Sequence, residues 1–184
     1  MTSSFSQPPI TVERYHQMAE AGLLPERGVE LIHGEIVPMS PIGRKHAAMV
    51  DRLNRLLARL VGEECIIRIQ NPIIADDFSE PEPDISIVHF RSDFYESALP
   101  QGKDVVLLIE VADSSLQRDY EVKLPLYAAS GIPECWIINL EEQVAEVFWE
   151  AKDGVYQHRE RIPPGGQLEA RGLRLRLEMK QLWG

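Results

Sequence analysis

The sequence has 184 residues, of which 44% are hydrophobic and 26% are charged, a balance typical of one globular domain and not of a disordered chain. Its net charge of −10 argues against a protein that coats nucleic acid non-specifically, because such binding depends on neutralising phosphates. We find no basic segment followed by an apolar run at the start and no membrane-spanning stretch, so we expect a cytoplasmic protein.

The first part of the chain predicts a short helix and a hairpin. Residues 1–10 resemble a flexible lead-in, and residues 11–184 are expected to form a single domain. Thr11 can cap a helix over TVERYHQMAEAG. VELIHGEIVPM alternates in polarity on either side of His33 and Gly34, which predicts a hairpin.

Residues 46–61 carry the clearest helical pattern in the sequence. Apolar residues recur there at helical spacing, arginines take the other face, and Gly62 is a natural stop. The segment from Arg44 to Arg68 contains six basic residues and three acidic ones. A solvated helix face is one interpretation of this basic excess, and contact with a phosphate backbone is the other.

The remaining elements alternate between strands and one further helix. That helix is expected over residues 116–130, with a kink or a late start at Pro125, because proline lacks an N–H. The strands are expected at CIIRIQ, ISIVHF, DVVLLIEVA, WIINL, VAEVFW, VYQHRER and LRLRLEM, the last two peripheral and placed around the turn at 163–166. This order predicts an α/β (α+β) fold in which helices pack on a mixed sheet.

Glu110 is the first candidate site residue. It interrupts the run 105–111, which is apolar on both faces, as in a covered central strand. Burying an unpaired carboxylate costs on the order of several kcal/mol. We therefore expect Glu110 to be protonated, to pair with a cation of the protein, or to bind a metal ion at the open end of its strand.

Asp84 is the second candidate. Glu80, Glu82 and Asp84 are spaced by two and project to the same side of an extended chain, where a divalent cation would relieve their repulsion. Hard oxygen ligands favour magnesium or manganese. Asp84 begins an apolar strand and is the better ligand, whereas Glu80 and Glu82 are expected in an exposed acidic loop.

Lys123 is the third candidate. It lies roughly 9 to 10 Å along the axis of the helix that follows the Glu110 strand, so its side chain can reach back to the strand end. Asp119 lies four residues earlier on the same helix face. A surface salt bridge between these two residues is the alternative interpretation.

Taken in order, these motifs resemble the PD-(D/E)xK, or restriction-endonuclease-like, superfamily, and most closely its Uma-type branch of bacterial endonucleases. The resemblance covers nearly the whole chain, from the ELIHGEIV hairpin and the His46 helix through EPDISIV, IEVADSS and GIPECWII. It implies a central mixed sheet flanked by helices, with an extra N-terminal hairpin and C-terminal strands. It also implies an endonuclease that cleaves DNA with Mg²⁺ or Mn²⁺.

The resemblance assigns roles by position. Asp84 and Glu110 would bind the cation together with the peptide carbonyl of Val111, and Lys123 would assist catalysis. The superfamily's lysine normally follows the glutamate by two residues, where this chain has Ala112. In branches of this kind the next helix supplies the lysine instead.

Glu30 and His46 match two further positions that recur in the branch. Glu30 would be a further metal ligand, and His46 would contact a phosphate or water. The alternatives are a surface or cross-strand carboxylate for Glu30 and an ordinary hydrogen-bonded histidine at a helix start for His46.

Two other functions stay open at this point. One is a catalytically inactive nuclease fold that acts as a nucleic-acid-binding or partner-binding module, which the acidic net charge and Ala112 favour. The other is a metal hydrolase that acts on small phosphoesters. A homodimer is also compatible with the resemblance, and the apolar C-terminal strands could supply its symmetric interface.

Overall fold

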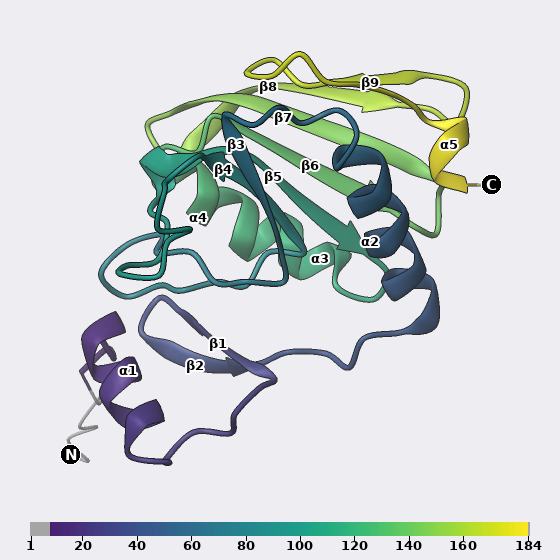
Figure 1. Cartoon of the computed structure of the whole chain (residues 1–184). Helices are drawn as coiled ribbons and strands as arrows, with labels where there is room; N and C mark the ends of the chain where they lie inside the picture. The colour runs from purple at the N-terminus through teal and green to yellow at the C-terminus, as the bar shows by residue number, and fades with distance from the viewer. Residues whose placement is uncertain (1–7, 184) are drawn as a thin grey trace.

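The computed structural model describes residues 8–183 (Figure 1). The expected lead-in comprised residues 1–10, and its residues 1–7 lie outside the described residues. Its last residue, Ile10, is attached to the hairpin, because the Ile10 N–H donates to the Gly34 carbonyl at 2.9 Å. None of the helices within residues 8–183 combines the length and the apolar character that a membrane span requires.

A six-stranded mixed sheet with the order β3-β4-β5-β6-β7-β8 forms the centre of the molecule, as expected from the sequence. Only the β5–β6 pair is parallel among these neighbours. The strands are β3 (Cys65–Ile69), β4 (Ile85–His89), β5 (Val105–Ala112), β6 (Glu134–Asn139), β7 (Val144–Lys152) and β8 (Val155–Ile162).

Helices cover both faces of this sheet (Figure 1). On one face, α2 (Arg44–Leu57) buries Met49, Val50, Leu53 and Leu57, a spacing that forms a single apolar stripe. The other face is covered by the helical segment that follows β5, through Tyr127. Every residue of β5 is therefore buried, because the strand is central and covered on both sides.

The helical segment after β5 is irregular ahead of Pro125, where the sequence predicted a kink or a late start. It consists of α3 (Leu116–Arg118), the π-helical turn η2 (Asp119–Lys123) and α4 (Leu124–Ala129), and α4 starts one residue before Pro125. Pro125 lacks the N–H that an α-helix would donate to residue 121, and a wider turn accommodates this loss. Single π turns inside helices frequently occur at functional sites.

The N-terminal elements lie beside one end of the sheet (Figure 1). They are α1 (Val12–Glu20), capped by the Thr11 side chain, and the hairpin of β1 (Val29–Ile32) and β2 (Glu35–Pro38). His33 and Gly34 form its turn with φ values of 50° and 78°. The Glu80 N–H donates to the Leu31 carbonyl at 2.7 Å, so the hairpin is attached to the segment that leads into β4.

The C-terminal strands are arranged differently from the expectation. β8 is an edge strand of the main sheet, and β9 (Gln167–Glu169) pairs with β10 (Arg176–Glu178) in a separate small sheet. The short helix α5 (Lys180–Trp183), like the 3₁₀ turn η1 (Gly102–Asp104), was not predicted. Leu168, Leu177 and Leu182 pack on the same core as α2, so these short elements depend on tertiary contacts.

Candidate active site

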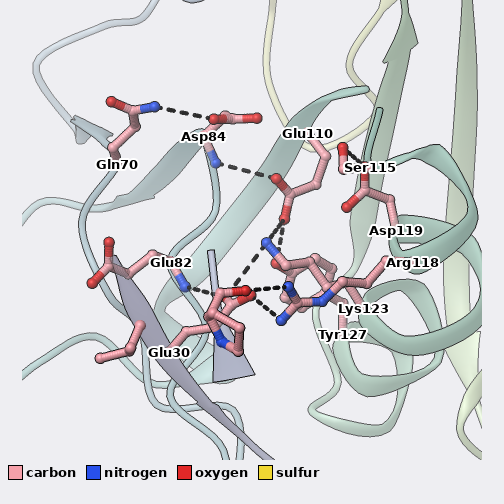
Figure 2. A network of polar contacts seen from close by, with 12 residues as sticks. Glu30, Gln70, Glu82, Asp84, Glu110, Ser115, Arg118, Asp119, Lys123 and Tyr127 are labelled. Atoms are coloured by element: carbon pink, nitrogen blue, oxygen red, sulfur yellow. Dashed lines mark hydrogen bonds and ion pairs between the residues drawn. The ribbon is translucent and has the colours of Figure 1, made fainter. Parts of the chain in front are cut away.

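The register of β4 and β5 brings the two predicted acids together. Ile85 pairs with Ile109, so Asp84 lies across from Glu110 although 26 residues separate them. The Asp84 N–H donates to Glu110 Oε2 at 3.3 Å, and the Val111 N–H donates to Asp84 Oδ2 at 2.9 Å. Figure 2 shows the Glu110 carboxylate beside the Asp84 backbone N–H at the strand ends.

Lys123 approaches this pair from the π turn and is only 7% exposed. Its Nζ lies 3.2 Å from Glu110 Oε1 and 3.5 Å from Glu30 Oε2, between the two carboxylates (Figure 2). Burial lowers the pKa of the Lys123 ammonium, but the surrounding carboxylates, Glu110 first, outweigh burial and raise that pKa above its ordinary value. The lysine is therefore a fixed positive charge.

The alternative of a surface salt bridge between Lys123 and Asp119 is wrong. Both side chains are buried, and Asp119 Oδ2 accepts a hydrogen bond from Ser115 Oγ at 2.7 Å. Burial raises the pKa of Asp119, while the nearby Lys123 charge and the Ser115 hydroxyl lower it.

Glu30 projects from β1 into the same cluster and is 1% exposed. Its Oε1 accepts a hydrogen bond from Arg118 at 2.5 Å, and its Oε2 accepts the Glu82 N–H at 3.2 Å and faces Lys123. The expected alternative of a surface carboxylate is therefore wrong. Glu30 already contacts two cationic side chains and one N–H. These contacts hold Lys123 and Arg118 in place.

Asp84 is held by two side chains besides the backbone. His46, in the first turn of α2, places Nε2 2.9 Å from Asp84 Oδ2, and Gln70 Nε2 donates to Oδ1 at 3.3 Å. The hydrogen bond to Asp84 and the neighbouring negative charges raise the pKa of His46, against the opposing effect of burial. His46 thus contacts Asp84 directly, whereas the sequence interpretation had it contact a phosphate or water.

Three residues of the cluster were not identified from the sequence: Gln70, Arg118 and Tyr127. The Tyr127 hydroxyl donates to Glu110 Oε1 at 2.5 Å from a fully buried position. Its sequence signal was its place one helical turn after Lys123, on the same helix face. Arg118 and Gln70 carried no such signal, because their partners Glu30 and Asp84 lie 88 and 14 residues away in the sequence.

Glu110 has the most perturbed carboxyl group of the cluster. Burial raises its pKa to about 8, and the charges of Asp84 and Asp119 act in the same direction. Lys123 and the Tyr127 hydroxyl lower the pKa but do not compensate for burial. The protein by itself therefore supplies too little positive charge to keep all of these carboxylates ionised at neutral pH.

Apart from Tyr127, the side chains of this cluster line a cavity of about 410 Å³. Two of its lining residues, Arg118 and Lys123, are permanent cations. Six are acids: Glu30, Glu82, Asp84, Glu110, Asp113 and Asp119. The expected exposed acidic loop is wrong, because Glu82 is half-buried in this lining and Glu80 is buried with a carboxylate oxygen 2.6 Å from His16 Nε2.

The donor set fits a hard divalent cation. Asp84 Oδ1 and Glu110 Oε2 each accept a single hydrogen bond of 3.3 Å, so each oxygen keeps acceptor capacity. Across residues 8–183, no group of three or more His, Cys, Asp or Glu side chains is arranged to hold a metal ion. A cation here would complete its shell with backbone, water or substrate oxygens, as magnesium commonly does.

Comparison with known proteins identifies the family and the fold of the chain. Residues 12–180 match the family model Uma2, described as "Putative restriction endonuclease". A crystal structure described as "a putative nuclease belonging to DUF820 from Anabaena variabilis ATCC 29413" superposes with a TM-score of 0.70 at 20% identity. The match covers 95% of this chain and 98% of that one, and it shows a shared fold. No curated protein matches the sequence.

Proposed function

Because the chain belongs to the Uma2 family, described as "Putative restriction endonuclease", we propose that it hydrolyses phosphodiester bonds of DNA with Mg²⁺ or Mn²⁺. The observation that carries the proposal is the meeting of Asp84 and Glu110 with Lys123 in one acid-rich cavity. Asp84, Glu110 and the carbonyl of Val111 would hold the cation. When bound, such a cation polarises a phosphate and lowers the pKa of a water molecule.

The side chains around the cation site divide the remaining work. Lys123 lies next to Glu110 and can orient the attacking water or offset the negative charge that develops on the phosphate. Glu30 keeps the Lys123 ammonium in place from its other side. His46 and Gln70 orient the Asp84 carboxylate, one at each oxygen.

The basic face of α2 supports a nucleic-acid substrate. The helix begins beside the cavity, where Gly43 and His46 are lining residues. Arg44, Lys45, Arg52 and Arg55 are exposed along it. Exposed arginines and lysines that lead away from a phosphate-cleaving site can hold a phosphate backbone without reading the bases. Local attraction of this kind is compatible with a net charge of −10 for the whole chain.

The test is cleavage of supercoiled and linear DNA by the pure protein with magnesium or manganese. We expect Asp84→Asn and Glu110→Gln each to reduce cleavage by about a hundredfold or more, as loss of a group that stabilises a transition state does. Glu169→Gln, which removes an exposed carboxylate on β9, is the matched control and should retain full activity. Absence of cleavage by the wild type, or cleavage that survives both site variants, would refute the proposal.

A catalytically inactive nuclease fold is the second candidate. The observation in its favour is that the site has Ala112 where the superfamily normally places its lysine. Calorimetric titration with Mg²⁺ or Mn²⁺ separates the two candidates, because an inactive site of this kind should bind no cation.

A further inference from the structure

The outer edge of β3 is partly open for hydrogen bonding. The Phe90 N–H donates to the Glu64 carbonyl at 2.8 Å and the Gln70 N–H to the Asp84 carbonyl at 3.0 Å. Residues of an antiparallel strand alternate in bonding direction, so the backbone groups of Cys65, Ile67 and Ile69 point away from β4. The Cys65 N–H donates to the Gly62 carbonyl at 3.2 Å, and the Ile69 carbonyl accepts from Asn71 Nδ2 at 2.7 Å. Within residues 8–183 no strand pairs with this edge, and Ile67 has no hydrogen-bond partner on it.

An exposed aromatic pair lies next to this edge. Phe90 is 51% exposed and Phe94 62% exposed, and their rings meet edge to face with centroids 5.8 Å apart. Together with Cys65, Ile66 and one acid, Glu63, they line a shallow and mostly apolar concavity. An unpaired edge strand beside exposed aromatic side chains is a surface that associates readily with another chain.

Two opposite charges on the same strand face form no ion pair among the described residues. The Arg68 guanidinium lies over the Tyr95 ring, 5.8 Å from its centroid, but it has no carboxylate partner there. Its Nε is buried without an acceptor, and burial lowers the Arg68 pKa. Glu64 is exposed, four residues earlier, and likewise forms no ion pair in the part of the chain that the structure describes. Side chains two or four residues apart project from the same strand face, which here is also the face of Ile66 and Phe90.

We propose that a second copy of this chain pairs antiparallel with β3 around a two-fold axis at Ile66. This register places each Glu64 directly opposite the partner's Arg68, so two Glu64–Arg68 ion pairs form across the axis. Ile66 then faces its own counterpart, and the Ile67 N–H donates to the carbonyl of the partner's Cys65. The Cys65 N–H gives up its 3.2 Å hydrogen bond to the Gly62 carbonyl and donates to the carbonyl of the partner's Ile67. The charged residues fall in non-hydrogen-bonded pairs, where side chains approach most closely.

The opposite edge of the sheet is a poorer interface. The sequence suggested the C-terminal strands, but the exposed residues of β8 are mostly polar or charged. Several of them already pair within the chain: Arg161 with Glu142 at 2.8 Å, Glu160 with Arg171 at 3.1 Å and His158 with Glu150 at 2.9 Å. A partner at β8 would have to displace these contacts, whereas a partner at β3 supplies contacts that are missing.

Sedimentation or light scattering of the full chain over a range of concentrations tests the proposal. We expect the wild type to dimerise. Glu64→Arg and Arg68→Glu should each raise the dissociation constant at least about tenfold, because each puts like charges opposite one another. Mixing these two variants should restore a dimer, since positions 64 and 68 then carry opposite charges in every pair across the axis. The double variant with both Glu64→Arg and Arg68→Glu in one chain should dimerise for the same reason.

Two further variants complete the test. Arg176→Glu changes an exposed charge on β10 and should leave association unchanged. Phe94→Ser alters no charge and should raise the dissociation constant of the dimer about tenfold. This variant still tests the proposal if a charge variant does not fold. A monomeric wild type, a dimer that resists the single variants, or singles that the mixture fails to rescue would overturn the proposal. Nuclease activity is not the readout, so this proposal and the proposed function can fail separately.

Discussion

Two buried glutamates on neighbouring strands, Glu110 in β5 and Glu134 at the start of β6, have different surroundings. Burial raises the pKa of both carboxyl groups. The oxygens of Glu134 each accept a short hydrogen bond, from the Trp136 indole and from the Arg171 N–H, both at 2.7 Å. Glu110 accepts hydrogen bonds from the Asp84 N–H, Lys123 and Tyr127, but it lies in a cavity lined by five further acids. Glu134 also lines a cavity, of about 340 Å³, in which Glu150 is the one other acid among the described residues.

The difference shows that burial of a carboxylate does not by itself mark a site. The contacts of Glu134 satisfy its acceptors and join β6 to the segment before β10, which is a structural role. The surroundings of Glu110 leave negative charge in excess and acceptor capacity in reserve. A cation therefore has a stronger physical reason to bind at Glu110 than at Glu134.

The sharpest test of this comparison removes each carboxylate separately. Glu110→Gln should reduce cleavage by about 10²- to 10³-fold. It should leave the fold intact, because burial already favours the neutral form of this carboxyl group. Glu134→Gln should retain cleavage but lower stability by about 1–2 kcal/mol, since its amide would face the Arg171 donor. Cleavage assays and denaturant unfolding of both variants measure this. Equal loss of activity in the two would remove the distinction.

Lys123→Met should have the next largest effect, on stability as well as on activity. The substitution removes the ammonium that lies between the buried carboxyl groups of Glu30 and Glu110. We expect the free energy of unfolding to fall by about 3 kcal/mol. Combining it with Glu110→Gln should recover part of that loss. Urea unfolding of the single and double variants checks the coupling, and strict additivity would contradict it.

Tyr127→Phe should weaken divalent-cation binding about tenfold, because second-shell groups that orient a ligand typically contribute that much or more. The hydroxyl holds Glu110 Oε1, so its loss frees the carboxylate to rotate. Tyr95→Phe is the matched control, since the Tyr95 hydroxyl donates to the His89 carbonyl at 2.8 Å, away from the cavity. Calorimetry with Mn²⁺ compares the two, and equal affinities would exclude a role for Tyr127.

The smallest expected effect concerns pH. The folded-state pKa of Glu134 is raised by burial, so its favourable contribution is complete below the unfolded-state pKa and is lost as the pH rises through the folded value. Wild-type stability relative to Glu134→Gln should therefore increase on going from neutral pH to about pH 5, by about 1 kcal/mol or less. Exposed Glu169→Gln should give no such trend in parallel unfolding experiments.

The sequence alone determined most of the sheet and the identity of the central residues. Asp84 and Glu110 were recognisable because each acid adjoins or interrupts an apolar run, which binary patterning makes visible without coordinates. The spacing of apolar residues likewise specified α2 and the strands of the main sheet. The match to Uma2 and the shared fold of the solved nuclease structure confirm the family and the architecture.

Only the tertiary structure decided which side chains surround those acids. Tyr127 reaches the cluster from α4, directly after the π turn. Arg118 also donates to the Pro38 carbonyl at the end of the hairpin, and Gln70 has a φ of 49°. The burial of Glu80 likewise depends on α1 and the hairpin, which pack against the segment before β4. Local propensity reports what a residue prefers among its sequence neighbours, whereas charge balance inside a cavity depends on elements up to 88 residues apart.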